Sequence, residues 1–429
     1  MKNLLLANRF CIFEYKTTEQ THFSMLQSPK DSKLMKFPKA FLLFFVLVGF
    51  SCTQANEEKS SQKKEPKPEQ IQATTVSNQK EYKGSLPIDR IKLPKGFKIN
   101  IFAENVDNAR SLALGEKTVF VGNRQGNKVF GLQDLDKDGV AENKFVIAKG
   151  LEMPNGVAFR KGDLYVAEVS RILRFADIEA NLKTPPKPEI INSEFPSDFH
   201  HGWKFIAFSP DDKLYVPVGA PCNVCLKNNK IYSSITRMNP DGSDLEVFAK
   251  GVRNSVGFDW HPETKELWFT DNGRDMMGDD LPSDELNHAP KAGMHFGFPF
   301  CHQGDTPDPE FGKQRNCNEF APPSQKLGAH VAALGMRFYT GNTFPKKYKN
   351  AIFIAQHGSW NRSSKVGYKI MVAFLEGNKV VGYEEFATGW LEGEKAWGRP
   401  VDIQPLEDGS ILISDDYANA VYRVWYEGI

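Results

Sequence analysis

Six short apolar runs recur along this chain at intervals that few folds use. Each run ends in a small, amide or acidic residue; the six are VFVGN (119–123), LYVAE (164–168), LYVPVG (214–219), LWFTDNG (267–273), IFIAQHG (352–358) and ILISDD (411–416). The starts of successive runs lie 45, 50, 53, 85 and 59 residues apart, which is the length of one β-propeller blade, with one longer interval before the fifth run. The spacing therefore predicts a radial repeat of small sheets.

Further strands flank these runs. An apolar segment precedes each one (SLAL, GVAF, FIAF, SVGFDW, LGMRFY and PVDIQ), and another follows most of them, with D-G, P-D and N-G turns between. We therefore predict an all-β, six-bladed β-propeller over residues 85–429, with an insertion at about 276–345 between the fourth and fifth blades. FKINIFA (97–103) and VYRVWY (421–426) are expected to pair and close the ring, which removes a free sheet edge.

The N-terminal region predicts export. From Met35 the chain reads MKFPKAFLLFFVLVGFSC, in which two lysines precede an apolar run and a small residue precedes Cys52, as in a bacterial lipoprotein signal. We interpret 1–52 as a leader with lipidation at Cys52 and a true start at Met35; an ordinary signal peptide or a single membrane anchor are the alternatives. Residues 53–84 are polar and predict a flexible tether. The expected location is the periplasm or the outer membrane, with the membrane reached only through the lipid anchor.

The charge balance argues against a nucleic-acid partner. The chain carries 54 basic and 53 acidic residues, a formal net charge of +1. A nucleic-acid-binding domain normally shows a clear basic excess.

Four cysteines fall within the predicted propeller. In an exported domain they suggest two disulfides, and proximity favours Cys222–Cys225 and Cys301–Cys317 among the three pairings. The C-x-x-C pair is alternatively redox-active or haem-binding, but Leu226 stands where covalent haem attachment requires histidine. The chain has no C-x-x-C-H motif for an attached haem, so an oxidoreductase with this sequence would need a separate electron carrier.

Polar residues cluster where the innermost strands begin and where the second strands end. Loops at one face of a propeller converge on the central channel, so these residues are expected to share one site. The first group is Arg110, Asn155, His200, His201, Arg253, Asn254, His330 and Arg399, and the second is Glu168, Asp271, Asn272, Asp275, His357, Asp415 and Asp416. Three arginines facing one channel repel one another unless an anion lies between them, so the pattern predicts a polyanionic ligand with a histidine base.

Several longer motifs resemble a known family. They are HHGWKFIAFSPDDKLYVPVG (200–219), GVRNSVGFDW (251–260), LWFTDNGRD (267–275), DELN (284–287), HGSWNR (357–362) and GRPVDI (398–403). Over residues 93–426 the chain resembles the soluble sugar dehydrogenases that depend on pyrroloquinoline quinone (PQQ), the glucose/sorbosone dehydrogenase family. The resemblance implies a six-bladed propeller with a tricarboxylate quinone across the channel and one Ca²⁺ bound to it.

The resemblance also assigns residue roles. By position, His201 matches the catalytic base, Arg253 and Asn254 the pair that holds the quinone edge, Arg399 a ligand of a cofactor carboxylate, and Gly273 and Arg274 the backbone carbonyls that bind calcium. Arg110, from the ring above, is expected to contact the cofactor as well. Two positions depart from the family: Ala220 replaces the aspartate that supports the base, and His357 with Arg362 stands where a cofactor-binding lysine is expected.

These assignments predict an oxidoreductase acting on a sugar or a related alcohol or aldehyde. His201 takes a proton from a hydroxyl, hydride passes to the quinone, and Ca²⁺ with Arg253 stabilises the charge that develops on the quinone oxygen. The alternatives are a calcium-dependent lactonase or esterase and a non-catalytic binding propeller.

Two further segments carry expectations. DLDKDGVAE (134–142) begins like a calcium loop, but Phe145 stands where an EF-hand has its bidentate glutamate, and a hairpin turn is the favoured interpretation. The insertion near 276–345 is expected to overhang the channel mouth and to influence substrate choice.

Overall fold

The computed structural model describes residues 84–428, and this part of the chain is built almost entirely from strands. The predictions of a leader, a lipid anchor and a tether therefore lie outside the described residues, apart from Gly84. The only helices described are four 3₁₀ turns of three or four residues. None of the described helices has the length and apolar character needed to cross a membrane.

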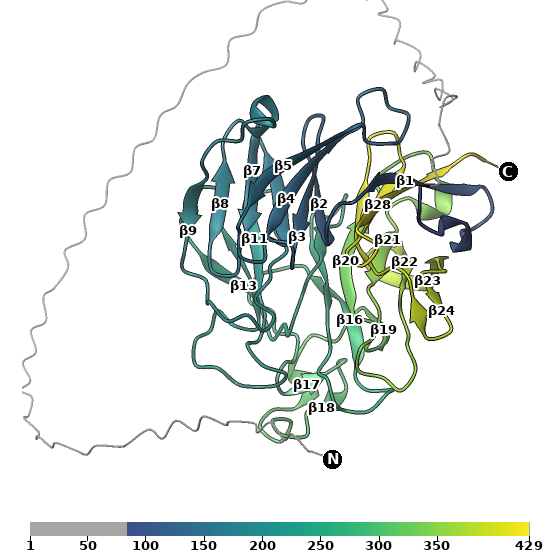
Figure 1. The fold of residues 1–429 in the computed structure, drawn as a ribbon. Helices are drawn as coiled ribbons and strands as arrows, with labels where there is room; N and C mark the ends of the chain where they lie inside the picture. Colours follow the sequence, from purple (N-terminus) through teal and green to yellow (C-terminus); the bar gives the residue numbers. More distant parts are fainter. Residues whose placement is uncertain (1–83, 429) are drawn as a thin grey trace, which may run out of the picture. The chain divides into compact units, whose positions relative to one another are not determined.

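Six four-stranded antiparallel sheets form the predicted six-bladed propeller (Figure 1). The strands of the first three blades are β2 (Ala109–Leu114), β3 (Val119–Asn123), β4 (Lys128–Gln133) and β5 (Asn143–Lys149); β6 (Gly156–Arg160), β7 (Asp163–Ala167), β8 (Ile172–Phe175) and β9 (Glu189–Asn192); and β10 (Ala207–Phe208), β11 (Leu214–Val218), β12 (Ser234–Met238) and β13 (Glu246–Lys250). The fourth and fifth are β14 (Phe258–Trp260), β15 (Leu267–Asp271), β16 (Ser283–Ala289) and β19 (Gln325–Ala329); and β20 (Ala333–Phe338), β21 (Ile352–Gln356), β22 (Lys369–Glu376) and β23 (Lys379–Ala387).

The sixth blade joins the two ends of the described chain. Its order is β1 (Phe97–Glu104), β28 (Ala420–Tyr426), β27 (Ile411–Asp415) and β26 (Pro400–Pro405). The register pairs Phe97 with Tyr426 and Ile99 with Val424. The predicted closure is confirmed, because an N-terminal strand completes a blade that otherwise comes from the C-terminal end of the chain.

The recurring apolar runs become the second strand of each blade. Every residue of β3, β11, β15, β21 and β27 is buried. Both faces of these strands pack against neighbouring blades. Apolar and polar residues therefore do not alternate along them, and the sequence shows a continuous apolar run. Phe120 of β3 shares one buried cluster with Leu164 of β7.

The insertion lies within the fourth blade, which corrects the prediction that it separates blades four and five. Residues 290–324 connect β16 to β19, and they carry the small hairpin of β17 (Cys301–His302) and β18 (Thr306–Pro307). The sequence of β16, SDELNHA, lacks the β-branched and aromatic residues by which the other strands were identified.

The loop at 134–142 connects β4 to β5, so it joins two paired strands as the hairpin interpretation predicts. The carboxylates of Asp134, Asp136, Asp138 and Glu142 approach within 4.8 Å of one another on this turn.

Candidate active site

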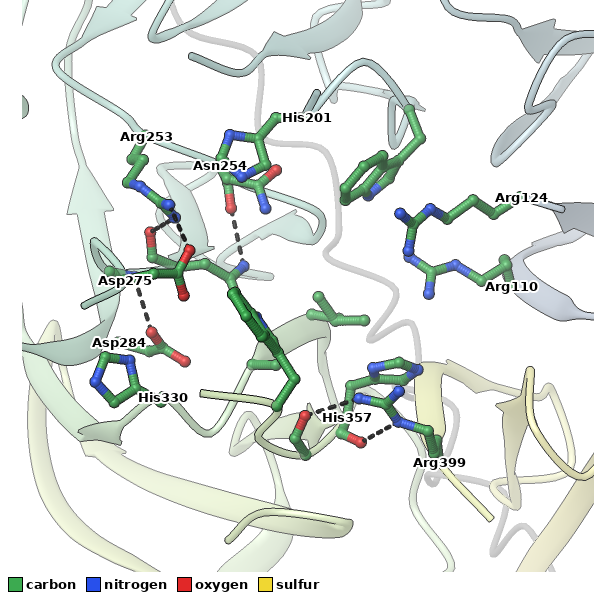
Figure 2. Close-up of a pocket in the computed structure, with 17 residues that line it drawn as sticks. Arg110, Arg124, His201, Arg253, Asn254, Asp275, Asp284, His330, His357 and Arg399 are labelled. Atoms are coloured by element: carbon green, nitrogen blue, oxygen red, sulfur yellow. Dashed lines mark hydrogen bonds and ion pairs between the residues drawn. The ribbon is translucent and has the colours of Figure 1, made fainter. Parts of the chain in front are cut away.

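One pocket collects most of the residues expected around the channel. Its volume is about 280 Å³, and it is bordered by residues that precede the inner strands or follow the second strands of several blades (Figure 2). The predicted residues that line it are Arg110, His201, Arg253, Asn254, Asn272, Gly273, Asp275, His330, His357 and Arg399. The sequence-based list omitted Arg124, Trp203, Asp284 and Trp360, which also line it.

Other predicted residues do not line the pocket. They are Asn155, Glu168, His200, Asp271, Arg274, Arg362, Asp415 and Asp416. Some of these stand behind lining residues and hold them: Asn155, fully buried, accepts a hydrogen bond from Arg110 Nε at 2.8 Å. Arg362 instead bonds the backbone oxygens of Asp279 and Ser364, so the structure does not bring it to the expected cofactor site.

His201 is a buried, neutral imidazole whose orientation is fixed by the backbone. Its Nδ1 lies 2.8 Å from the carbonyl oxygen of Ala220, so Nδ1 carries the proton and donates it there. Nε2 is then the unprotonated nitrogen. Burial, followed by the charge of Arg253, lowers the pKa of His201 well below 6.5. The missing aspartate at position 220 is therefore replaced by a main-chain carbonyl, and Nε2 has the form that a general base requires.

A close approach of two chain segments holds this histidine. His201 has a left-handed backbone (φ 52°). A Cβ on Gly219, directly after β11, would lie 2.6 Å from His201 Cβ and 2.9 Å from its carbonyl oxygen. Only glycine at 219 permits this contact.

The protein itself satisfies nearly all of the Arg253 guanidinium. Nε donates to Asn223 O (2.8 Å), Nη1 to Asn272 O (3.2 Å), and Nη2 to both Asn223 Oδ1 (2.9 Å) and Asp275 Oδ2 (3.0 Å). A guanidinium has five N–H groups, so one on Nη1 is left for a ligand. Asn223 lies inside the Cys222–Cys225 disulfide loop, and that predicted disulfide is confirmed. The disulfide loop 222–225 therefore holds the Arg253 guanidinium in place, and we call it the clamp around Arg253.

A second network holds Arg110 and His357 on the other side of the pocket. Asp416 accepts hydrogen bonds from Arg110 Nη1 and His357 Nε2, each at 2.8 Å. Burial opposes ionisation of Asp416, but His357 and Arg110 outweigh it and hold its pKa below the usual value. Burial lowers the pKa of His357 to about 4, so this histidine is neutral near pH 7. Arg110 is 1% exposed and its charge is balanced by Asp416.

Two pocket arginines have no carboxylate partner among residues 84–428. Arg399 donates to the carbonyl oxygens of His357 (3.2 Å) and Gly358 (2.8 Å). Arg124 makes no hydrogen bond or ion pair through its guanidinium to the described residues, and its Nε is buried without a partner. The Arg124 guanidinium stacks over Trp203, 3.7 Å from the ring centre, and Figure 2 shows it beside Arg110. Arg124 follows VFVGN directly, so the rule that selected loops after second strands would have found it.

The fourth blade supplies a wall of buried carboxyl groups. Burial raises the pKa of Asp271 to about 7, of Asp284 to about 6 and of Glu285 to about 8. The oxygens of Asp271 accept the backbone N–H groups of Arg253 (2.8 Å) and Asn254 (2.6 Å). This carboxyl group therefore fixes the segment that carries the two residues expected at the quinone edge.

The turn at 272–275 offers oxygen donors of the kind that Ca²⁺ prefers. Gly273 lines the pocket between Asp275 and Asp284, and its N–H donates to Asp284 Oδ1 at 2.8 Å. Arg274 directs its side chain away, where it pairs with Asp308 of the insertion. The carbonyl and carboxylate oxygens of this turn fit a hard cation, and the arginines fit an anionic organic group.

The insertion supports this turn from behind. Within the predicted insertion at 276–345, Asp284, His330, Ala332 and Leu334 line the pocket, whereas no residue of 290–324 does. The predicted Cys301–Cys317 disulfide is confirmed and closes part of the insertion. Trp360, 68% exposed, is the aromatic residue at the pocket margin instead.

Fold and site together define a class of protein: a six-bladed propeller with an arginine-rich central pocket beside a buried neutral histidine. The model of a family described as "Domain of unknown function (DUF7133)" matches residues 88–424, and the chain belongs to that family. A relative from Borreliella burgdorferi, described as an uncharacterized protein, is 37% identical over 365 residues, which is 79% of this chain and 92% of the relative.

Solved structures with the same fold include quinone-dependent enzymes. The holo form of the PQQ domain of a pyranose dehydrogenase from Coprinopsis cinerea has a TM-score of 0.68 at 18% identity, covering 81% of this chain and 98% of that one. A calcium structure of a Trichoderma reesei family AA12 protein gives 0.69 at 18%, covering 78% and 97%. The PQQ-bound aldose sugar dehydrogenase of Streptomyces coelicolor gives 0.57 at 18%, covering 78% and 99%. At these identities the likeness establishes the fold.

Proposed function

We propose that this protein is an oxidoreductase that binds PQQ and Ca²⁺ in the central pocket and oxidises a hydroxyl group of a sugar or a related alcohol or aldehyde. The observation that carries the proposal is His201. A neutral imidazole, held through Nδ1 by Ala220 O and set in a pocket lined by four arginines, combines a proton acceptor with a binding site for a polycarboxylate. The pyranose dehydrogenase PQQ domain and the PQQ-bound aldose sugar dehydrogenase, which share the fold, support this choice.

Each pocket residue then has a definite task. Arg399 and Arg110 would hold carboxylate groups of the quinone, Arg253 and Asn254 would contact the quinone edge, and the backbone carbonyls of Gly273 and Arg274 would bind Ca²⁺. His201 Nε2 takes the hydroxyl proton of the substrate. The chemistry supplied by PQQ and Ca²⁺ when bound is acceptance of a hydride equivalent from the carbon that carries this hydroxyl. Trp360, at the exposed margin, offers an apolar ring face on which a sugar stacks.

Reconstitution tests the proposal. The purified chain is mixed with PQQ and Ca²⁺, and the quinone absorbance and dye reduction are recorded with a panel of aldoses. We expect a saturable spectral change that needs both components, and sugar-dependent dye reduction. Absence of PQQ binding, or binding without any sugar or alcohol oxidation, would count against the dehydrogenase.

The calcium-dependent lactonase fits the pocket less well. That chemistry needs a cation surrounded by free side-chain carboxylates and amides. Here both oxygens of Asp284 accept backbone N–H groups, from Gly273 (2.8 Å) and Ala333 (3.2 Å), and Asn272 Nδ2 donates to two carbonyl oxygens. Lactone hydrolysis with Ca²⁺ alone in the reconstitution assay would favour this alternative, and no activity of either kind would favour a binding module.

We further propose that the protein works outside the cytoplasm as a lipoprotein anchored through Cys52 and passes electrons to a separate acceptor, a quinone or a cytochrome. Two disulfides in the described residues are typical of an oxidising compartment. Cys52→Ala should release the protein from the membrane fraction while the purified propeller stays folded. Unchanged fractionation of this variant would exclude the anchor.

A further inference from the structure

We propose that Arg124 and Trp203 form a subsite for a carboxylate group of the substrate, so that the sugar oxidised is an acidic one of the uronic-acid type. This inference rests on the proposed function, because it concerns the substrate of the same pocket. It begins with the charges of the pocket arginines. Arg110 is balanced by Asp416 and Arg253 by Asp275. Arg399 and Arg124 form no such ion pair with the described residues. Of these two arginines, the family resemblance assigns Arg399, and not Arg124, to the cofactor.

The groups around Arg124 are built to receive an acceptor. Its Nε and the neighbouring Trp203 Nε1 are both buried donors without a hydrogen-bond partner in the described part of the chain. An unpaired buried donor is costly unless a ligand satisfies it. Burial, followed by the charges of Arg110 and later Arg399, lowers the pKa of Arg124 to about 10, so it is still a cation near neutral pH. An anionic oxygen would relieve the repulsion and satisfy the donors at once.

Position assigns this anion to the substrate and not to the cofactor. Trp203 lies two residues after His201, with their ring centres 6.0 Å apart, so the stacked Arg124 borders the place where the reacting hydroxyl must sit. Arg124 is also shallower than Arg110. It is half-buried on the loop after β3, next to exposed Gln125, whereas Arg110 is 1% exposed at the start of β2. A substrate enters above a cofactor already in place, and it meets the shallower cation.

The test compares acidic and neutral sugars that share one ring. The full chain is loaded with Ca²⁺ and pre-reduced PQQ, so that no turnover accompanies binding, and titrated by calorimetry with D-glucuronate against D-glucose and with D-galacturonate against D-galactose. We expect at least one acidic sugar to bind tenfold or more tighter than its neutral counterpart. Arg124→Gln should remove this preference, lowering acidic-sugar affinity more than neutral-sugar or PQQ affinity, and Arg124→Lys should restore part of it.

Arg315→Gln is the matched control. Arg315 also stacks over an aromatic ring, Phe320 at 4.4 Å, and carries the same charge, but it lies in the insertion and pairs with Glu319. It should leave the preference intact. Equal affinity for acidic and neutral sugars, or a loss of PQQ affinity in Arg124→Gln as large as the loss of acidic-sugar affinity, would overturn the subsite.

The same titrations without PQQ separate this inference from the proposed function. Tight, Arg124-dependent binding of an acidic sugar by protein that never binds PQQ would refute the dehydrogenase and leave the subsite standing. An active dehydrogenase with no preference for acidic sugars would refute the subsite and leave the proposed function standing.

Discussion

Arg253 and Arg124 line the same pocket, but the protein holds their guanidinium groups in opposite ways. Arg253 gives four hydrogen bonds to Asn223, Asn272 and Asp275, whereas the Arg124 guanidinium has only the Trp203 ring among the described residues. A side chain with nearly all of its hydrogen bonds made before a ligand arrives positions that ligand without further ordering. A side chain left unpaired obtains its partner from the ligand. We call the side of the pocket that carries Arg253 the prepared side and the side that carries Arg124 the receptive side.

The largest effect is expected at His201, which lies between the two sides. A general base acts in the chemical step, so His201→Asn should lower turnover by a factor of order 10²–10⁴ while PQQ and Ca²⁺ still bind. Single-turnover reduction of the bound quinone measures this. His200→Asn is the control, because His200 is exposed and absent from the pocket lining; it should change the rate at most a few-fold. Loss of activity only in the His200 variant would invalidate the role of His201.

Stability should separate the two arginines directly. Arg253→Met leaves Asp275 and three partly buried acceptor groups without the buried guanidinium that they bind, so the free energy of unfolding should fall by about 3–5 kcal/mol. Arg124→Met removes a half-buried charge that forms no ion pair with the described residues, and the change should stay within about 0.5 kcal/mol or favour the folded state. Urea denaturation of the two apo-variants gives both numbers. Equal losses would show that Arg124 has a structural partner after all.

Cofactor affinity should depend on the clamp around Arg253 more than on the loop of Arg124. Asn223→Ala removes three hydrogen bonds that fix Arg253 and Asp275, each worth about 0.5–1.5 kcal/mol. Loss of about 1.4 kcal/mol of this sum from the binding free energy should weaken PQQ binding roughly tenfold. Replacing Cys222 and Cys225 together by serine should act in the same direction.

Asn108→Ala provides the matched variant on the receptive side. Asn108 Oδ1 accepts the backbone N–H groups of Arg124 (3.0 Å) and Gln125 (2.8 Å), but it does not touch the Arg124 guanidinium. PQQ titration should show less than a twofold change for this variant. A loss equal to that of Asn223→Ala would mean that both sides bind the cofactor.

The sequence predicted the prepared side better than the receptive one, and the reasons are physical. Arg253, Asn254 and His201 stand in motifs that begin or precede strands rich in β-branched and aromatic residues, so both their place in the fold and their convergence followed from the repeat. The support of His201 by Ala220 O could not be predicted, because a main-chain carbonyl leaves no mark in the residue type. Asn223 was hidden for a similar reason, since its role depends on where the disulfide loop folds back.

Other differences come from the strength of local signals. β16 was missed as a strand because SDELNHA is polar, although it is held on both sides by β15 and β19. Arg362 was expected near the cofactor because it is close to His357 in the chain, but its guanidinium reaches the backbone oxygen of Asp279 and the carboxylate of Asp280 instead. Arg124 directly follows the second strand of the first blade, but the residues predicted from such loops begin at Glu168 in the second blade and do not include it.

The smallest effect, and the finest comparison, concerns the pKa of His201. Burial is the main cause of its depression, Arg253 the next, and Arg124 a weaker one. The neutral form is the base, so activity is lost as the pH falls through this pKa, and the acid limb of kcat/KM should lie well below pH 6.5. Removing a neighbouring cation raises the pKa, which moves protonation to higher pH. Arg253→Met should therefore raise the pKa of His201 more than Arg124→Met does, and Arg315→Gln should not change it.

NMR titration of the His201 ring in the apo-variants, assigned by the resonance missing in His201→Asn, measures these pKa shifts without cofactor binding. A larger shift from Arg124→Met would place Arg124, and not Arg253, as the nearer charge to the base and would reverse the comparison.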